Sequence, residues 1–180
     1  MTDIALPIPD AYWVESGRFL AGEYPGTLDP ESTRRRMDAF LEAGIDTFFD
    51  LTHDHELPAY LPILADQARH YEREIAYHRF AIRDRGLPEP GQMTALLNAI
   101  DASLAAGRKV YVHCWGGVGR TGMTVGCYLV RRGRTGRQAL DQLAAWWQDV
   151  PKRVHFPRSP ETDEQVEFIL NWHDPHPKSK

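Results

Sequence analysis

The chain has 180 residues, of which 42% are apolar, and this is enough for one domain with a buried core. Its 21 basic and 25 acidic residues give a formal net charge of −4, which excludes a polycation that binds nucleic acid indiscriminately. It has no apolar run near the ~20 residues that span a bilayer, no signal-peptide stretch in MTDIALPIPD, and too few cysteines for a disulfide scaffold. We expect a cytoplasmic protein whose partner is neither membrane nor nucleic acid.

Five short apolar runs predict strands, in chain order at residues 12–14, 19–21, 45–51, 75–82 and 109–113. Helices are predicted at about residues 30–43, 62–73, 90–106, 120–132 and 135–148, with a last helix after residue 160. Strands that alternate with helices, before a helical C-terminal half, indicate an α/β fold. We expect one domain over residues 1–172, with a central, mostly parallel sheet flanked by helices, and a polar tail at 173–180 that frays.

Residues with helix-capping chemistry mark several predicted helix ends. Asp29 before Pro30 is typical of a helix start, because the carboxylate accepts hydrogen bonds from free backbone N–H groups and proline fits the first turn. Gly44 is expected to end that helix. Thr135 and Ser159 are expected to cap the last two helices.

The segment KVYVHCWGGVGRTGMTVGCYLV, residues 109–130, joins a predicted strand to an apolar helix through a glycine-rich loop. The G-x-G-x-x-G pattern at residues 117–122 would fit a dinucleotide-binding loop. That motif opens a βαβ unit and needs an acid at a strand end, whereas this strand comes late and Asp141 falls inside a predicted helix. The ATP-binding loop needs a lysine, and none occurs between Lys109 and Lys152. Both nucleotide-binding interpretations are therefore disfavoured.

The same loop has the chemistry of an anion trap that contains a nucleophile. Small residues at a helix N-terminus let backbone N–H groups point at an anion, and Gly116, Gly117 and Gly119 permit the close approach. The helix dipole also favours the thiolate form of Cys114 at the start of the loop. Arg120 at its end can hold two phosphate oxygens with a planar guanidinium. A thiolate beneath a bound phosphate can carry out covalent phosphoryl transfer.

The run HCWGGVGRTG, residues 113–122, resembles the H-C-x5-R-[ST] signature of cysteine-dependent protein tyrosine and dual-specificity phosphatases. Its H-C-x-G-G-x-G-R-[ST] form is similar to that of the kinase-associated dual-specificity phosphatases. The resemblance extends more loosely to residues 18–26, 50–52 and 159–165. It implies a phosphatase-like fold and hydrolysis of phosphomonoesters through a phosphocysteine, with no metal and no other cofactor.

The resemblance also implies a role for each residue of the motif. Cys114 would be the nucleophile, Arg120 the phosphate clamp, and Thr121 would offer its hydroxyl to the thiolate. His113 would orient the loop by donating to the backbone rather than act as a base. Asp84, 30 positions before Cys114 and directly after a predicted strand, would be the general acid and then the general base. The phosphate-binding set would be Trp115, Gly116, Gly117, Val118, Gly119 and Arg120.

Asp84 also has a simpler interpretation, as a turn residue beside Gly86. Arg83 and Arg85 flank it, and nearby positive charge disfavours the protonated carboxyl that a general acid needs. A catalytic Asp84 therefore requires these arginines to point away or toward the substrate. Otherwise, the acids nearest the end of the neighbouring predicted strand are Asp50, Asp54 and Glu56.

Three further features each have a functional and a structural interpretation. Gln165 would position a water molecule by analogy with relatives, or lie on a solvated helix face. His53 and His55 are of metal-ligand type, but no cysteine or third histidine is near in sequence, so we expect a polar loop at the pocket entrance. Cys127 lies roughly 10 Å along the helix from the end of the loop, too far for a disulfide with Cys114, so we expect it to pack in the core.

We expect a cysteine-dependent phosphatase of the protein tyrosine or dual-specificity type, acting on a phosphorylated protein or peptide or on a small phosphate ester. The same chemistry would serve inositol phosphates or RNA 5′ ends, but the loop lacks the lysines of lipid-directed relatives and the net charge is negative. A phosphate-binding pseudophosphatase module is the alternative outside the enzymes, and the presence of both Cys114 and Asp84 disfavours it. Arsenate reduction would need a resolving thiol, which Cys127 cannot supply.

Overall fold

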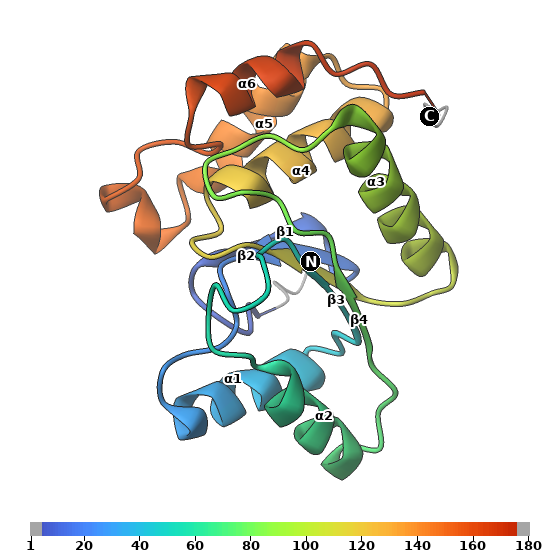
Figure 1. Ribbon diagram of the computed structural model, residues 1–180, viewed down its shortest axis with the longest axis vertical. Coiled ribbons are helices and arrows are strands. Elements are labelled where there is room, and N and C mark those ends of the chain that lie inside the picture. Colours follow the sequence, from blue (N-terminus) through green and yellow to red (C-terminus); the bar gives the residue numbers. More distant parts are fainter. Residues whose placement is uncertain (1–4, 176–180) are drawn as a thin grey trace.

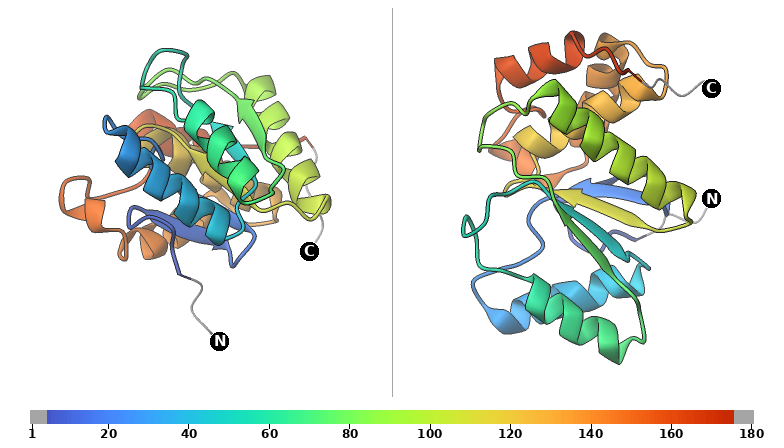
Figure 2. Two further views of the ribbon diagram at one scale, coloured as in Figure 1. Left: turned by 90° about the horizontal axis from the view of Figure 1, so that it is seen from below. Right: turned by 45° about the vertical axis from the view of Figure 1, so that its right-hand side comes forward.

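The computed structural model describes residues 5–175, and it places a five-stranded sheet between two groups of helices (Figure 1, Figure 2). The strands are β1 (Ala11–Glu15), β2 (Phe19–Gly22), β3 (Thr47–Asp50), β4 (Ala76–Arg79) and β5 (Val110–His113). Their order in the sheet is β1-β2-β5-β3-β4; β1 runs antiparallel to β2, and the other pairs are parallel. The predicted α/β fold with a central, mostly parallel sheet is confirmed.

The helices divide between the two sides of the sheet, as Figure 1 shows. One side carries α1 (Pro30–Glu42) and α2 (Leu61–His70). The other carries α3 (Pro90–Ala105), α4 (Gly119–Arg131), α5 (Gly136–Trp147) and α6 (Asp163–Leu170). One turn of 3-10 helix, η1 (Pro151–Val154), has no counterpart among the predicted elements. Of the helices that the structure describes, none has both the length and the apolar character that a membrane crossing needs.

The central strand β5 joins two apolar cores, one on each side of the sheet. Val110 and Val112 belong to the core beneath α3 and α4, and Tyr111 belongs to the core beneath α1 and α2. Helix α4 is buried along almost its whole length, because α5 and α6 pack on its outer side. Cys127 lies in this helix, where burial raises the pKa of its thiol well above the ordinary value, as suits a packing residue. The loop between β5 and α4 is therefore held by two rigid elements.

The side-chain caps explain where the helices begin. Asp29 accepts a hydrogen bond at the start of α1, and Thr135 forms a capping box at the start of α5, so both predicted starts are confirmed. The predicted cap at Ser159 is wrong. Thr162 caps α6 instead, because Gln165 lies three residues on and completes a reciprocal capping box. The hydroxyl of Ser159 is free to bond elsewhere.

The polar tail predicted at 173–180 is anchored near its start. The carboxylate of Asp174 accepts hydrogen bonds from Arg131 Nε at 2.7 Å and from Trp172 Nε1 at 3.3 Å. The Asp174 and Arg131 side chains are both buried, so the prediction of fraying is wrong at this residue. Residues 176–180 lie outside the part of the chain that the structure describes.

His113, the last residue of β5, is buried beneath the carboxyl edge of the sheet. Its Nε2 lies 2.8 Å from the Tyr60 hydroxyl and its Nδ1 lies 3.3 Å from the Cys114 carbonyl oxygen. Burial lowers the pKa of His113 to about 4, against the opposing effect of Asp50. The ring is therefore neutral at pH 7 and contacts the backbone at the point where the loop begins.

Stability should fall as the pH falls below about 6.5, because the unfolded chain then binds a proton that the folded chain excludes until about pH 4. Between pH 7 and pH 5 this linkage should cost about 2 kcal/mol of unfolding free energy. Urea denaturation at the two pH values measures the loss. The loss should shrink in His113→Asn, and an equal loss in the variant would assign the pH dependence to other groups.

Candidate active site

The carboxyl edge of the parallel strands opens into a cavity of about 390 Å³ at the start of α4. Its wall includes Cys114 and Arg120 together with Asp84, which lies on the loop after β4. The structure therefore brings together the side chains expected to serve as nucleophile, phosphate clamp and general acid. The rest of the wall comes partly from the loop itself and partly from other segments. The loop contributes Trp115, Gly116, Val118 and Gly119, and the other segments contribute Glu23, Arg85, Lys152, Phe156 and Glu161.

The loop after Cys114 has backbone N–H groups without partners in the protein. Within the described residues, no hydrogen bond is donated by the N–H groups of residues 115–118. The first N–H groups of a helix also lack intrahelical partners, which adds those of Gly119 and Arg120 at the start of α4. These are the backbone positions predicted to bind phosphate, and the helix dipole makes them attractive to an anion.

Donors from three other segments hold the carbonyl groups of this loop. In a trans peptide the C=O and the N–H of the following residue lie in one plane and point in opposite directions, so a held carbonyl fixes the direction of the next N–H. The bonds therefore fix the N–H groups of residues 116, 117 and 119 before any ligand binds. The donors are the Tyr24 N–H (2.8 Å from Trp115 O), the Lys152 ammonium (3.1 Å from Gly116 O) and the Ser159 hydroxyl (2.7 Å from Val118 O).

At two positions of the motif, neighbouring atoms approach the backbone so closely that only glycine fits. Gly117 has φ +73°, and a Cβ there would lie 2.5 Å from the carbonyl carbon of Gly22 at the end of β2. At Gly122, a Cβ would lie 2.1 Å from the hydroxyl oxygen of Ser159. Gly122 therefore makes room for the side chain that holds the Val118 carbonyl.

The Arg120 side chain is buried, and groups from two other loops fix its guanidinium. Glu56 accepts from Nη2 at 2.7 Å and from Nη1 at 3.1 Å in a two-bond fork. Asp84 accepts from Nη2 at 3.0 Å, and the Ile82 carbonyl accepts from Nη1 at 3.1 Å. Burial would lower the pKa of Arg120, but the bonds to Glu56 raise it above its usual value. The site therefore carries a fixed positive charge at the end of the loop.

Glu56 was expected only as an alternative to Asp84, and the structure shows it in a different role, as a partner of Arg120. The polar loop after β3 was expected at the pocket entrance. His55 is exposed and pairs with Asp54 at 3.3 Å, and neither residue is among those that line the active-site cavity. Glu56 instead turns inward to Arg120. Burial would raise the pKa of Glu56, but hydrogen bonds from Arg120 and from the His53 backbone lower it below its usual value. An acid just past the end of a parallel strand was the signal available in the sequence.

Asp84 is half exposed on the cavity wall, and Arg120 is its ion-pair partner. Arg85, which flanks it in sequence, lines the same cavity and pairs with Glu161 at 2.7 Å. This is one of the arrangements that a catalytic Asp84 requires. The alternative acid Asp50 is buried and accepts hydrogen bonds from Thr52 and Tyr77.

Two other predicted site residues have different contacts from those expected. The Thr121 hydroxyl donates to the Gly22 carbonyl at 3.4 Å instead of to the sulfur of Cys114. Gln165 is fully buried, so its interpretation as part of a solvated helix face is wrong. Its amide donates to the Gly86 carbonyl at 3.3 Å and ties the loop that carries Asp84 to α6.

A scan against protein-family models matches residues 10–169 to the DSP-PTPase phosphatase domain described as Swiss Army Knife protein, PTP-SAK. Cyclin-dependent kinase inhibitor 3 of Rattus norvegicus is 31% identical to this chain over 104 residues. That match covers 56% of this chain and 48% of the relative, so the chain spans about half the length of the curated relatives it matches.

Solved structures share the fold over most of its length. The active form of Tk-PTP has a TM-score of 0.64 and 28% identity, with 90% of this chain and 94% of that chain covered. Kinase associated phosphatase has a TM-score of 0.67 and 19% identity, with 86% and 88% covered. The match to kinase associated phosphatase supports the fold alone.

Anion binding can test whether the bonds to the loop carbonyls align the N–H groups. Ser159→Ala removes the donor to the Val118 carbonyl, so the N–H of Gly119 is no longer fixed, and tungstate should bind about tenfold more weakly. Isothermal titration calorimetry measures the affinity. Ser103→Ala is the matched control, because Ser103 makes a similar bond to a carbonyl inside α3, far from the cavity. Unchanged affinity in Ser159→Ala, or an equal loss in the control, would contradict the role given to Ser159.

Proposed function

Since the chain belongs to the DSP-PTPase phosphatase family, we propose that it hydrolyses phosphomonoesters through a phosphocysteine on Cys114, without a metal. The observation that carries this proposal is the row of unpartnered N–H groups between Cys114 and α4, with Arg120 fixed at its end. A phosphate in this loop would have its oxygens on N–H donors and its phosphorus above the sulfur. Arg120 would stabilise the charge that develops on those oxygens in the transition state.

In the first step, the Cys114 thiolate attacks phosphorus, and a P–S bond forms while the bond to the leaving oxygen breaks. The leaving oxygen carries the electron pair of that bond and needs a proton. Asp84, on the cavity wall, would donate it. A phosphate dianion would also compete with Asp84 for Arg120 Nη2, and this competition would release the carboxyl for proton transfer.

In the second step, a water molecule attacks the phosphocysteine, and the P–S bond breaks. Asp84 would now accept the proton of that water, so it acts as base where it first acted as acid. The products are inorganic phosphate and the regenerated thiolate. Thr121 would assist this step only if its hydroxyl gave up its hydrogen bond to the Gly22 carbonyl and donated to the sulfur of Cys114 instead.

The charges on the cavity wall favour a substrate with a single phosphate. Lys152 pairs with Glu23 at 2.5 Å, Arg85 pairs with Glu161 at 2.7 Å, and Arg120 is held by two carboxylates. A polyphosphorylated inositol would need cations in excess, because each further phosphate brings two charges out of water. We therefore propose a phosphorylated residue of a protein or peptide as the substrate.

Cys114→Ser should reduce turnover of p-nitrophenyl phosphate by about 10³ or more, because a hydroxyl is a far weaker nucleophile than a thiolate. Iodoacetate should inactivate the wild type, and inorganic phosphate should protect it. Cys127→Ser is the matched control, since Cys127 is buried outside the cavity. Wild-type turnover by Cys114→Ser, or activity lost to chelator and restored by added zinc or manganese, would contradict the proposal.

Asp84→Asn should slow the release of a poor leaving group most. Phosphopeptide cleavage should fall by about 10² to 10⁴, the usual range for general acid catalysis. An activated aryl phosphate should be affected less, because its leaving oxygen hardly needs a proton. The two rates are compared over a pH series, where the basic limb of the profile should flatten in the variant. Equal slowing of both substrates with an unchanged basic limb would leave Asp84 as a turn residue.

A further inference from the structure

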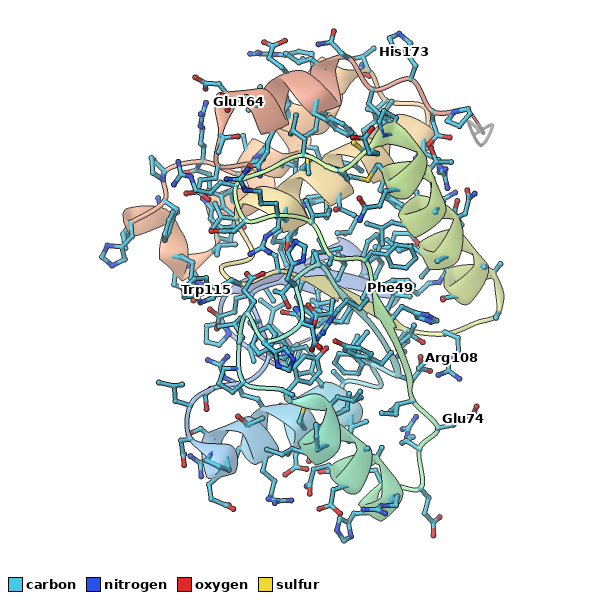
Figure 3. The ribbon with its side chains drawn as sticks, in the orientation of Figure 1. Phe49, Glu74, Arg108, Trp115, Glu164 and His173 are labelled. Carbon is cyan, nitrogen blue, oxygen red and sulfur yellow. The ribbon has the colours of Figure 1, made fainter. Side chains whose placement is uncertain are left out.

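A second cavity, of about 350 Å³, adjoins the active-site cavity. The two share Glu23 and Trp115. Leu28, Leu57 and Pro58 contribute apolar atoms to the second cavity. Figure 3 shows Trp115 at the edge of the molecule, between η1 and the chain that leads into α1. A ligand whose phosphate binds in the loop would therefore reach the second cavity across the Trp115 side chain.

Two of the side chains around this cavity are far more exposed than apolar residues usually are. Leu28 is 89% exposed and Trp115 is 56% exposed. In the row of unpartnered N–H groups after Cys114, Trp115 contributes only its backbone N–H. The proposed chemistry therefore does not require a large apolar side chain at this position. Clustered, exposed apolar side chains next to a catalytic cavity are typical of a surface that a ligand covers.

Hydrogen bonds hold the walls of the second cavity in place. The Tyr24 hydroxyl donates to the Pro58 carbonyl at 2.9 Å, which joins the two loops on either side. The backbone N–H of Thr27 donates to the Thr33 hydroxyl at 2.9 Å and fixes the turn that carries Leu28. A preformed apolar cavity binds a side chain with little further cost in ordering.

The charged groups in the second cavity compensate each other. Its lining includes Arg36 and Glu23, and these form an ion pair at 3.0 Å. Glu23 also binds Lys152 in the active-site cavity. Because both charges are paired, the second cavity does not favour a further phosphate or a charged side chain. It suits an uncharged, apolar group that is covalently linked to the phosphate-bearing residue.

We propose that the second cavity binds an apolar side chain of a phosphopeptide substrate, within a few residues of the phosphorylated residue. This inference rests on the proposed function of the active-site cavity. It follows from the continuity of the two cavities at Trp115, which lines both of them. The protein would thus bind the phosphorylated residue in the active-site cavity and an apolar neighbour of the same peptide in the second cavity.

The test uses phosphotyrosine peptides with serine and glycine flanks, in which one leucine is moved through each position from four residues before to four residues after the phosphotyrosine. At one or more positions, leucine should raise kcat/KM about tenfold over the peptide without leucine, as expected for burial of one leucine side chain. Leu28→Lys should remove most of that preference. Leu170→Lys is the matched control, because Leu170 is an exposed leucine on α6 outside both cavities, and it should retain the preference.

The outcomes separate this inference from the proposed function. Hydrolysis that depends on Cys114 but is indifferent to leucine at every position would overturn the inference and leave the proposed function standing. If no peptide is hydrolysed, the affinity of Cys114→Ser is measured for the same peptides. Equal affinities for the peptides with and without leucine would overturn the inference. Faster hydrolysis of a phosphoinositide in vesicles than of any leucine peptide would assign the cavity to a lipid chain and would also overturn it.

Discussion

The direction of the peptide groups between Cys114 and α4 is the constraint on which the site depends. The carbonyls of Trp115, Gly116 and Val118 are held by donors from the segment after β2, from η1 and from the loop before α6. These bonds fix the direction of the N–H groups of residues 116, 117 and 119. A bound anion therefore finds donors already aligned, so no protein reorganisation is needed when charge develops. The sheet and the buried helix α4 fix the two ends of this loop, and the three donors fix its middle.

The cavity wall combines fixed cations with nearly balanced charge. Arg120 is held by Glu56 and Asp84, and Lys152 is held by Glu23, so each cation is oriented by a carboxylate before a ligand arrives. The partial neutralisation lowers the general attraction for polyanions. Under the proposed function, selection would depend on the N–H groups, which suit one tetrahedral anion, and on the apolar surface around Trp115.

The local part of the site was predictable from the sequence, because the Cys114 to Arg120 spacing needs only one strand, one loop and one helix. The positions of the five strands and the capping of α1 and α5 also follow from local patterns. The contacts of Glu56 with Arg120, of Lys152 with Gly116 and of Ser159 with Val118 were not predicted. These partners lie 64, 36 and 41 residues apart in sequence, and local patterns do not show which distant segments meet. The mistaken cap at Ser159 shows the same limit, since its hydroxyl serves the loop and a nearer capping box serves α6.

The order in which the donors occur along the chain has a consequence for biosynthesis. A ribosome delivers all five strands and Cys114, the proposed nucleophile, by residue 114, but the side chains that hold the Gly116 and Val118 carbonyls come later, at residues 152 and 159. Chains grow from the N-terminus, so the sheet can assemble on a nascent chain whose loop after Cys114 still lacks the donors Lys152 and Ser159. A polypeptide truncated before η1 would keep the Cys114 thiol but lose the two side-chain donors that align the loop. The proposed phosphoryl transfer would therefore become possible only once the rest of the chain has been made.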